Sequence, residues 1–348
     1  MVPPMTHAAH DGAGVPDTVS TLPPDLARIY DPVQGDLDAV AHLLRDELSA
    51  DDRFIGELVA HVLHTKGKLL RPALVCLSAL ACGGGGAARL RVAGACELIH
   101  VASLIHDDVI DAADLRRGRA TVNAVWGNQV AVLLGDYLFS KAFHMLASLH
   151  DARLAAALAG ATVRMSQAEI KQIKYGNTPH TDASIYFDII AGKTAHLFSA
   201  ACRCGALTAG ASGPDAQVLS EFGLEWGMAF QITDDALDLT ATPEQVGKPI
   251  GSDIQTGKVT LPVIHALAKA PEPDRRRLEA LLDSGSDRHP DAAAEVARIL
   301  AGSGAIEHAL GVARAHAGRA AASLARLPGS PARDSLAALV QFVVARTS

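Results

Sequence analysis

The sequence predicts an all-α protein. Aromatic residues make up only 4% of its 348 residues, whereas alanine and leucine, which lead the helix propensity scale, are abundant. Long runs with helical periodicity alternate with short segments that contain glycine and proline. No long Pro/Ser linker divides the middle of the chain, so residues 24–348 are expected to form a single helical domain.

The N-terminal part of the chain begins with a segment that does not favour a helix. Residues 1–23 contain several prolines among small and polar neighbours, and they lack a basic region followed by an apolar core. We therefore expect a disordered tail rather than a signal peptide. Helices are then expected at residues 24–48, 51–65, 71–81, 88–111 and 122–149, with a break at the glycine run 83–86.

The C-terminal part continues the same helical pattern. Breaks are expected at residues 176–179, 211–214 and 243–257, where glycine and proline interrupt the apolar periodicity. The expected helices span residues 152–175, 181–208, 215–239, 261–268, 273–283, 292–303, 304–327 and 331–347. The two acidic motifs described below thus lie on separate helices of one array.

Composition excludes several classes of function. The formal net charge is −7 and the longest basic run is Arg275-Arg276-Arg277, so a nucleic-acid partner is not supported. The apolar stretches, such as residues 130–135, are interrupted before they reach membrane-spanning length. The five cysteines are odd in number and lack zinc-type spacing, which favours a reducing, cytoplasmic location.

Two copies of one acidic pattern are the most informative feature. Residues 107–111 and residues 234–238 both follow the pattern Asp-Asp-x-x-Asp at the end of an apolar run. In a helix the first and fifth positions share a face, so each copy presents two carboxylates together and a third beside them. Mg²⁺ prefers oxygen ligands and completes its shell with water and phosphate oxygens. The candidate metal ligands are therefore Asp107, Asp108, Asp111, Asp234, Asp235 and Asp238.

A single motif of this kind would more often be a solvated helix face. Two copies after apolar runs, the first followed by Arg116-Arg117-Gly118, make that alternative much weaker. Arginine binds phosphate through paired hydrogen bonds, so this arrangement favours a complex of metal and diphosphate. Further candidates for diphosphate binding are Lys68 and Arg71 in a basic loop that opens a helix, His100 two turns before Asp107, Lys193 in an apolar helix, and the loop lysines Lys248 and Lys258.

These motifs, in this order, resemble those of the trans-isoprenyl diphosphate synthases, the polyprenyl synthetase family. The matching segments lie between about residue 60 and residue 265: Lys68 with Arg71, residues 104–111 with Arg116-Arg117-Gly118, Lys193-Thr194, residues 230–235, and the loop with Lys248 and Lys258. One position departs from the family pattern, because Leu69 stands where the family usually has arginine. The resemblance implies a helical bundle around a deep central cavity.

The resemblance also implies a reaction. Mg²⁺ held by Asp107, Asp111 and Asp234, with Arg116, Lys193 and Lys258, would promote ionisation of an allylic diphosphate, and isopentenyl diphosphate would then attack the allylic cation. Isopentenyl diphosphate would be bound by Lys68, Arg71, His100 and Arg117. Thr194 and Gln231 would direct oxygen dipoles toward the cation. Because six aspartates and two diphosphates carry about −12, roughly three Mg²⁺ ions and seven basic groups would nearly neutralise the loaded site.

Product length is predicted from the residues just before the first motif. Ala102 and Ser103 stand five and four residues before Asp107, where a large aromatic residue in this family closes the elongation tunnel early. Two small residues therefore favour a long-chain, all-trans product over farnesyl or geranylgeranyl diphosphate. The side chains guessed to form the floor of the tunnel are Leu134, Leu138, Leu158 and Met165.

Three alternatives remain open at this point. The chain could make a short-chain product, act as the non-catalytic subunit of a heteromeric prenyl synthase, or be a class I terpene cyclase. A complete ionisation site argues against the subunit, and the second Asp-rich motif with its basic loops argues against the cyclase. By family analogy we expect a homodimer, with the helix at residues 122–149 as its interface, and a product delivered to a membrane.

Overall fold

The computed structural model describes residues 23–63, 67–84, 86–176, 178, 182–240, 258–283 and 292–345. In these residues the fold is all-α, as predicted, with one short antiparallel hairpin. The expected tail at residues 1–23 lies outside the described part except for Pro23, and so does Lys248.

The helices follow one another with short connections. In the first part of the chain they are α1 (Pro24–Tyr30), the 3-10 helix η1 (Asp31–Val33), α2 (Gln34–Glu47), α3 (Arg53–Leu63), α4 (Leu70–Ala81), α5 (Ala88–Ile110), α6 (Val122–Trp126), α7 (Asn128–Ala147) and α8 (Ala152–Tyr175). They continue with α9 (Ala183–Ile190), the π-helical turn η2 (Ala191–Ala195), α10 (His196–Thr208), α11 (Gly213–Thr240), α14 (Leu261–Lys269), α15 (Glu272–Asp283), α16 (Ala292–Gly302), α17 (Ala305–Leu324) and α18 (Pro331–Ala345). The hairpin strands are β1 (Leu115–Arg116) and β2 (Arg119–Ala120).

Three helices that the sequence predicts as continuous are interrupted. The first is broken by the 3-10 turn η1, which contains Pro32, since proline has no N–H to donate and restricts the residue before it. The helix expected at residues 122–149 is divided at Gly127, whose φ of 85° is left-handed. The helix expected at residues 181–208 contains the π-turn η2 between α9 and α10. Such turns occur frequently at functional sites.

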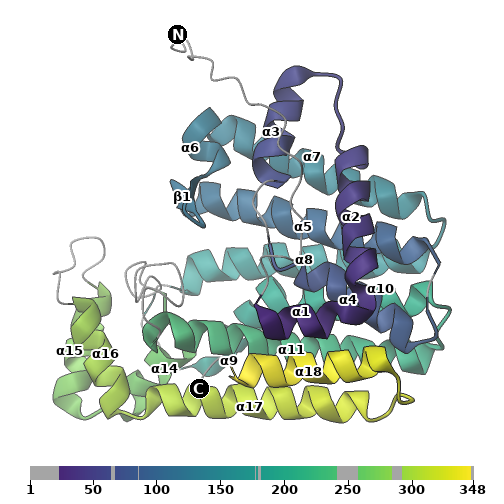
Figure 1. Cartoon of the computed structure of the whole chain (residues 1–348). Helices are drawn as coiled ribbons and strands as arrows, with labels where there is room; N and C mark the ends of the chain where they lie inside the picture. Colours follow the sequence, from purple (N-terminus) through teal and green to yellow (C-terminus); the bar gives the residue numbers. More distant parts are fainter. Residues whose placement is uncertain are drawn as a thin grey trace, which may run out of the picture.

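Helix α5 lies in the middle of the bundle. It packs along α7 and also contacts α2, α4 and α10 (Figure 1). Helix α11 lies between α10 and α17, and the C-terminal helix α18 lies beside α17. The largest fully buried side chain is Trp226 of α11, whose Nε1 donates to the carbonyl oxygen of Leu339 on α18 at 3.0 Å.

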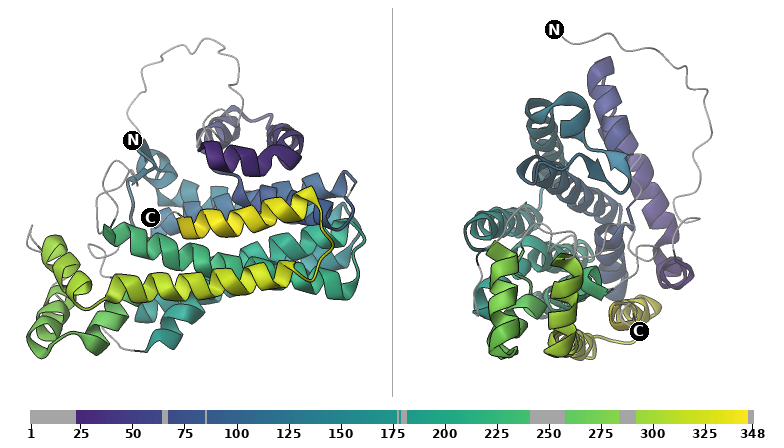
Figure 2. Two further views of the ribbon diagram at one scale, coloured as in Figure 1. Left: turned by 60° about the horizontal axis from the view of Figure 1, so that its bottom comes forward. Right: turned by 90° about the vertical axis from the view of Figure 1, so that its left-hand side faces the viewer.

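A second group of buried apolar residues lies around α14, where α15, α16 and α17 meet (Figure 2). It includes Ile264 and Leu267 of α14, Ile299 of α16 and Tyr186 of α9. Helix α11 contributes Phe222 and Trp226 to the main core and Ile232 to this second group, so it is packed on both sides. Helices α9 and α11 both carry residues of the candidate site.

Helix α7 is the one described helix that is long and apolar enough to cross a membrane by length and composition. It packs along α5 within the bundle, and Leu134 and Leu138 are buried there. Its opposite side exposes apolar side chains, including Val132 at 41% and Leu133 at 67%. This helix thus has one face in the core and a second apolar face on the surface.

Candidate active site

The first acidic motif lies at the C-terminal end of α5. Asp107 and Asp108 belong to its last turn, and Asp111 is its C-cap residue. Asp108 is buried, and its Oδ1 accepts a hydrogen bond from Nε of Arg116 at 2.7 Å. Asp111 is exposed, and Asp107 has 19% of its side chain exposed. The motif therefore separates into two carboxylates that face the solvent side and one that anchors an arginine.

The hairpin that follows carries the two predicted arginines. Leu115 pairs with Ala120 and Arg116 with Arg119, so that Arg117 and Gly118 form a two-residue loop. Both loop residues have a left-handed φ, 52° for Arg117 and 74° for Gly118. A two-residue hairpin loop with left-handed φ at both positions matches the right-handed twist of the strands. Its tightness places Arg116 on one side, against Asp108, and Arg117 at the tip.

A cationic cluster lies beside this hairpin, with Arg71 and His100 partly buried and Arg117 exposed at the hairpin tip. It combines Arg71 from α4, His100 from α5 and Arg117 from the hairpin tip, which the sequence predicted as ligands of one diphosphate. The guanidinium carbon of Arg71 lies 4.5 Å from the centre of the Phe198 ring. Burial lowers the pKa of Arg71 to about 10, so the group stays charged at neutral pH. Burial and the neighbouring Arg71 and Arg117 lower the pKa of His100, which is therefore neutral.

Glu97 is a member of this cluster that the sequence analysis missed. Its carboxylate interacts with both Arg71 and Arg117; burial raises its pKa, and the two arginines oppose that shift. The signal was present, since Glu97 is a lone acidic residue in an apolar run three positions before His100, and thus on a neighbouring face of the helix. A carboxylate that interacts with two arginines helps to hold both guanidinium groups in place.

The π-turn η2 brings Lys193 to the first motif. Nζ of Lys193 lies 3.4 Å from Oδ2 of Asp107 and 2.5 Å from Oε2 of Glu169 on α8. Gly192 permits this approach, because a Cβ added there would lie only 2.5 Å from Cβ of Ala168. The pKa of Asp107 is raised to about 6, mainly by burial and also by Glu169 and Asp111, whereas Lys193 opposes this shift.

The second acidic motif lies on α11. Asp234 and Asp238 share one face and are partly exposed, whereas Asp235 is buried. Oδ2 of Asp235 accepts a hydrogen bond from Tyr186 of α9 at 2.6 Å, and Oδ1 accepts one from Nε2 of Gln231 at 2.8 Å. Both carboxylate oxygens thus have protein donors, and this geometry favours an anchoring role for Asp235 over the predicted metal ligation.

Gln231 belongs to the same network. Thr194 Oγ1 donates to Oε1 of Gln231 at 2.8 Å, so the amide is held between Thr194 and Asp235. The sequence predicts that the oxygens of Thr194 and Gln231 face a cation. The structure brings the two residues together, but the Gln231 oxygen points toward the Thr194 hydroxyl. Tyr186, which supports this network from seven residues before Lys193, was not predicted.

The donor set fits a divalent cation that prefers oxygen. Asp107 with Asp111 on α5 and Asp234 with Asp238 on α11 each supply two carboxylates from one helix face. In the described residues no three acidic, histidine or cysteine side chains converge on a single point. Mg²⁺ often takes only one or two carboxylates and completes its shell with water and substrate phosphates. Each pair of aspartates is therefore suited to an ion that a diphosphate also binds.

Of the two loop lysines, the structure describes only Lys258. The backbone N–H of the next residue, Val259, donates to the carbonyl oxygen of Gly176 at 2.8 Å. This bond places the Lys258 segment beside the C-terminal end of α8, the helix that carries Glu169.

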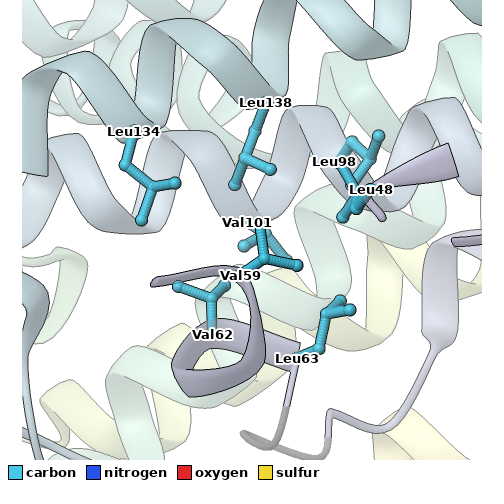
Figure 3. A pocket seen from close by; sticks show the side chains of 8 residues that line it. All are labelled: Leu48, Val59, Val62, Leu63, Leu98, Val101, Leu134 and Leu138. Carbon is cyan, nitrogen blue, oxygen red and sulfur yellow. The ribbon is translucent and has the colours of Figure 1, made fainter. Parts of the chain in front are cut away.

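The residues predicted to control product length lie on α5, before the first motif. Ala102 is fully buried, and Ser103 is partly buried, with its Oγ donating to the carbonyl oxygen of His100 at 2.8 Å. A small apolar pocket lies between α3, α5 and α7 (Figure 3). Its lining is Leu48, Val59, Val62, Leu63, Leu98, Val101, Leu134 and Leu138. Two of the four guessed floor residues, Leu134 and Leu138, therefore face an apolar pocket, and neither Leu158 nor Met165 is among its lining residues.

Comparison with known proteins is consistent with this geometry. The family model described as polyprenyl synthetase matches residues 52–300. The chain is 34% identical to octaprenyl diphosphate synthase of Escherichia coli (strain K12), over 92% of this chain and 99% of that protein. It is 40% identical to heptaprenyl diphosphate synthase component 2 of Geobacillus stearothermophilus, over 91% of this chain and 98% of that protein. The structure of a polyprenyl synthase from Caulobacter crescentus CB15, complexed with calcium and isoprenyl diphosphate, superposes with a TM-score of 0.88 at 32% identity, covering 93% of this chain and 98% of that one.

Proposed function

The chain belongs to the polyprenyl synthetase family, and we propose that it condenses isopentenyl diphosphate with an allylic diphosphate into a long-chain, all-trans polyprenyl diphosphate. It is a trans-prenyltransferase. One observation carries the proposal: helix α5 joins a carboxylate site at Asp107 to a cationic cluster at His100. Seven residues of helix separate them by about 10 Å, which leaves room for two diphosphates side by side.

The allylic diphosphate is assigned to the side of Asp107 and Lys193. Magnesium ions bound by the aspartate pairs, about three with substrate present, would supply Lewis-acid stabilisation of the departing diphosphate. Lys193, which lies 3.4 Å from Asp107, adds positive charge where the carbon–oxygen bond breaks and the electron pair stays on the diphosphate. Arg116, held by Asp108, is positioned to contribute a second cation there.

Isopentenyl diphosphate is assigned to the cluster of Arg71, His100 and Arg117, together with Lys68. There its double bond attacks the allylic carbon, a new carbon–carbon bond forms, and a proton leaves to the released diphosphate. Neutral His100 donates a hydrogen bond without adding charge, whereas the two arginines bind phosphate oxygens in pairs. The Thr194–Gln231 pair offers a polar surface with no free nucleophile, which suits a site that holds a cation.

The alternatives have weaker support. A non-catalytic subunit has no need for Lys193 to be held between Asp107 and Glu169, yet the chain keeps this arrangement. A terpene cyclase has no second diphosphate to bind, so the cluster of Arg71 and Arg117 would serve no purpose. Small residues at 102 and 103 favour a long product over a short one.

Assembly is proposed to be homodimeric. The face of α7 that is turned away from α5 exposes Val132 and Leu133, and α8 exposes Val163, Ile170 and Ile173 to between 55% and 67%. Apolar surface of this extent commonly marks a protein interface. In a dimer, the apolar face of α7 would be covered and removed from water. This fits a cytoplasmic enzyme that delivers its product to the membrane.

A direct assay tests the proposal. Purified protein is incubated with farnesyl diphosphate, labelled isopentenyl diphosphate and Mg²⁺, and the products are separated by chain length. Labelled long-chain prenyl diphosphate is the expected result. Hydrocarbon without diphosphate would favour the cyclase, and activity that needs a second protein would favour the subunit.

A further inference from the structure

A buried tyrosine near the N-terminus contacts the basic loop of the cationic cluster. Tyr30 is the last residue of α1 and lies before the matched segment 52–300. Its side chain is fully buried, and its hydroxyl donates to the carbonyl oxygen of Lys68 at 2.9 Å. The two residues are 38 positions apart in sequence, so this bond ties the first helix to the loop before α4.

The loop that receives this bond has an unfavourable backbone conformation. Leu69, the residue after Lys68, has φ 47° and ψ 35°, which is left-handed. For a residue with a Cβ this conformation is unfavourable, and such strain persists only where the surroundings hold it. Leu69 is also the N-cap residue of α4, and its carbonyl oxygen accepts the N–H of Ala73. Its conformation therefore sets where the helix that carries Arg71 begins.

The loop is closely packed against the cationic cluster on its other side. A Cβ added to Gly67 would lie 3.5 Å from a terminal nitrogen of Arg117 and 3.6 Å from Oε1 of Glu97. Tyr30 thus holds the carbonyl oxygen of Lys68, and the neighbouring Gly67 lies close to both Arg117 and Glu97. A shift of the loop would move Lys68 and the start of α4 relative to the hairpin tip.

The hydroxyl of Tyr30 is suited to a permanent donor role. Burial and the nearby Glu97 carboxylate both raise its pKa, so it stays protonated throughout the physiological range. A buried phenol that donates to a backbone carbonyl fixes that carbonyl more firmly than an exposed contact with water would. Its ring packs in the main core, which removing the hydroxyl would leave intact.

We propose that Tyr30 is a positioning residue for the isopentenyl diphosphate site. By holding the Lys68 carbonyl it fixes the strained loop at Leu69, and this loop in turn keeps Lys68 and Arg71 correctly placed relative to Arg117. This inference rests on the proposed function, which assigns that cluster to isopentenyl diphosphate. It gives α1 a role in the binding of one substrate only. The allylic side, built from α5, α8 and η2, has no contact with Tyr30 among the described hydrogen bonds.

The test is Tyr30→Phe, which removes the hydroxyl and keeps the ring. The expected result is a five- to tenfold rise in the KM for isopentenyl diphosphate, with kcat and the KM for farnesyl diphosphate changed less than twofold. Isothermal titration with isopentenyl diphosphate alone should show the same weakening of its Kd. If Tyr30 had only a structural role, Tyr30→Phe would lower the melting temperature without a selective rise in the KM for isopentenyl diphosphate. That result would overturn the proposal.

Tyr137→Phe on α7 is the control, because it also removes one tyrosine hydroxyl and keeps the ring. Tyr137 is partly buried and lies near Lys141, not at the loop. It should leave the KM for isopentenyl diphosphate unchanged, and an equal rise in this control would also contradict the proposal. The proposed function is judged separately by the wild-type protein. If the wild type makes polyprenyl diphosphate and Tyr30→Phe has an unchanged KM, only the role of Tyr30 fails; if the wild type makes none, the assignment of the site fails first.

Discussion

Nζ of Lys193 lies 3.4 Å from Oδ2 of Asp107, which joins the π-turn η2 to the end of α5. Helical periodicity alone would not place Lys193 beside Asp107. The extra residue of the π-turn shifts Lys193 relative to the regular helices on both sides. The lysine is also paired with Glu169. One ammonium group thus separates two carboxylates that would otherwise repel each other.

Lys193→Ala should lower kcat by about 100-fold, because it removes a positive charge from the place where the diphosphate leaves. The KM for isopentenyl diphosphate should change little, since Lys193 is not part of the cluster around Arg71. Steady-state kinetics with both substrates varied measures the two effects. Lys171→Ala is the control: Lys171 on α8 also pairs with an aspartate, Asp188, at 2.9 Å, but 48% of its side chain is exposed. Equal losses in both variants would contradict the role of Lys193.

Asp234 and Asp235 are adjacent in sequence and should respond differently to the same substitution. Asp235→Asn disturbs two buried hydrogen bonds, from Tyr186 and Gln231, and should cost about 1–3 kcal/mol of stability. Asp234→Asn should leave the melting temperature nearly unchanged and lower kcat by about 100-fold, because a metal ligand is lost. Thermal denaturation and kinetics over a range of Mg²⁺ concentrations separate the two outcomes.

Tyr186→Phe supplies a further check on the same network, since it removes a donor from Asp235 and leaves both aspartates in place. It should lower the melting temperature in the same direction as Asp235→Asn. If Asp235→Asn instead retained its stability and lost its response to Mg²⁺, Asp235 would be a metal ligand, as the sequence predicted.

A pH effect is expected at the contact between α11 and α17. Oε2 of Glu225 lies 2.7 Å from Nδ1 of His316 and accepts a hydrogen bond from Nε of Arg319 at 2.9 Å. Burial raises the pKa of Glu225, but these two partners outweigh burial and lower it overall. An acid with a lowered folded pKa stabilises the fold above its unfolded value of 4.5, and this contribution is lost as the pH falls through the folded pKa.

Glu225→Gln should therefore lower the stability by about 1 kcal/mol at pH 7, and by less at pH 3.5. Melting temperatures of the wild type and the variant across this range measure the difference. Glu221→Gln is the matched control one turn earlier on α11: Glu221 pairs with Arg326 at 2.7 Å, but the two side chains are 40% and 55% exposed. It should change the stability by less than about 0.5 kcal/mol. A difference at Glu225 that does not vary with pH would contradict the lowered pKa.

The helices, and the helix faces on which the candidate ligands lie, could be predicted because both depend on local sequence. Apolar periodicity located α3, α5, α8 and α11 to within a few residues, and the spacing within each acidic motif placed its first and last carboxylates on one face. The breaks at η1 and η2 were missed for different reasons. Pro32 indicates the first break, but the apolar periodicity on both sides of it favours one continuous helix. The π-turn has no clear local sequence signal beyond Gly192.

The partners that hold the site together could not be predicted, because they come from distant parts of the chain. Asp108 and Asp235 have the same place in their motifs as candidate ligands, yet each is buried and bonded to protein, one to Arg116 and the other to Tyr186 and Gln231. The pairing of Glu97 with Arg71 and Arg117 depends on how α4, α5 and the hairpin meet. The hydrogen bonds of Asp108 and Asp235 depend on the tertiary fold, which the spacing of the motifs does not predict.

Product length gives the last prediction. Ser103 is partly buried and shares a face with Asp107 one turn later, so an aromatic ring at this position would extend beside the reacting end of the allylic chain. Ser103→Phe should therefore shorten the main product by several isoprene units while the protein keeps its melting temperature. Ala102→Tyr should shorten it too, but Ala102 is fully buried, and overpacking there should also cost about 1–3 kcal/mol.

Chain length is measured by thin-layer chromatography and mass spectrometry of the dephosphorylated products. Ala301→Phe on the exposed side of α16 is the control and should leave the product unchanged. Unaltered product length in both Ser103→Phe and Ala102→Tyr would show that the growing chain does not pass this part of α5.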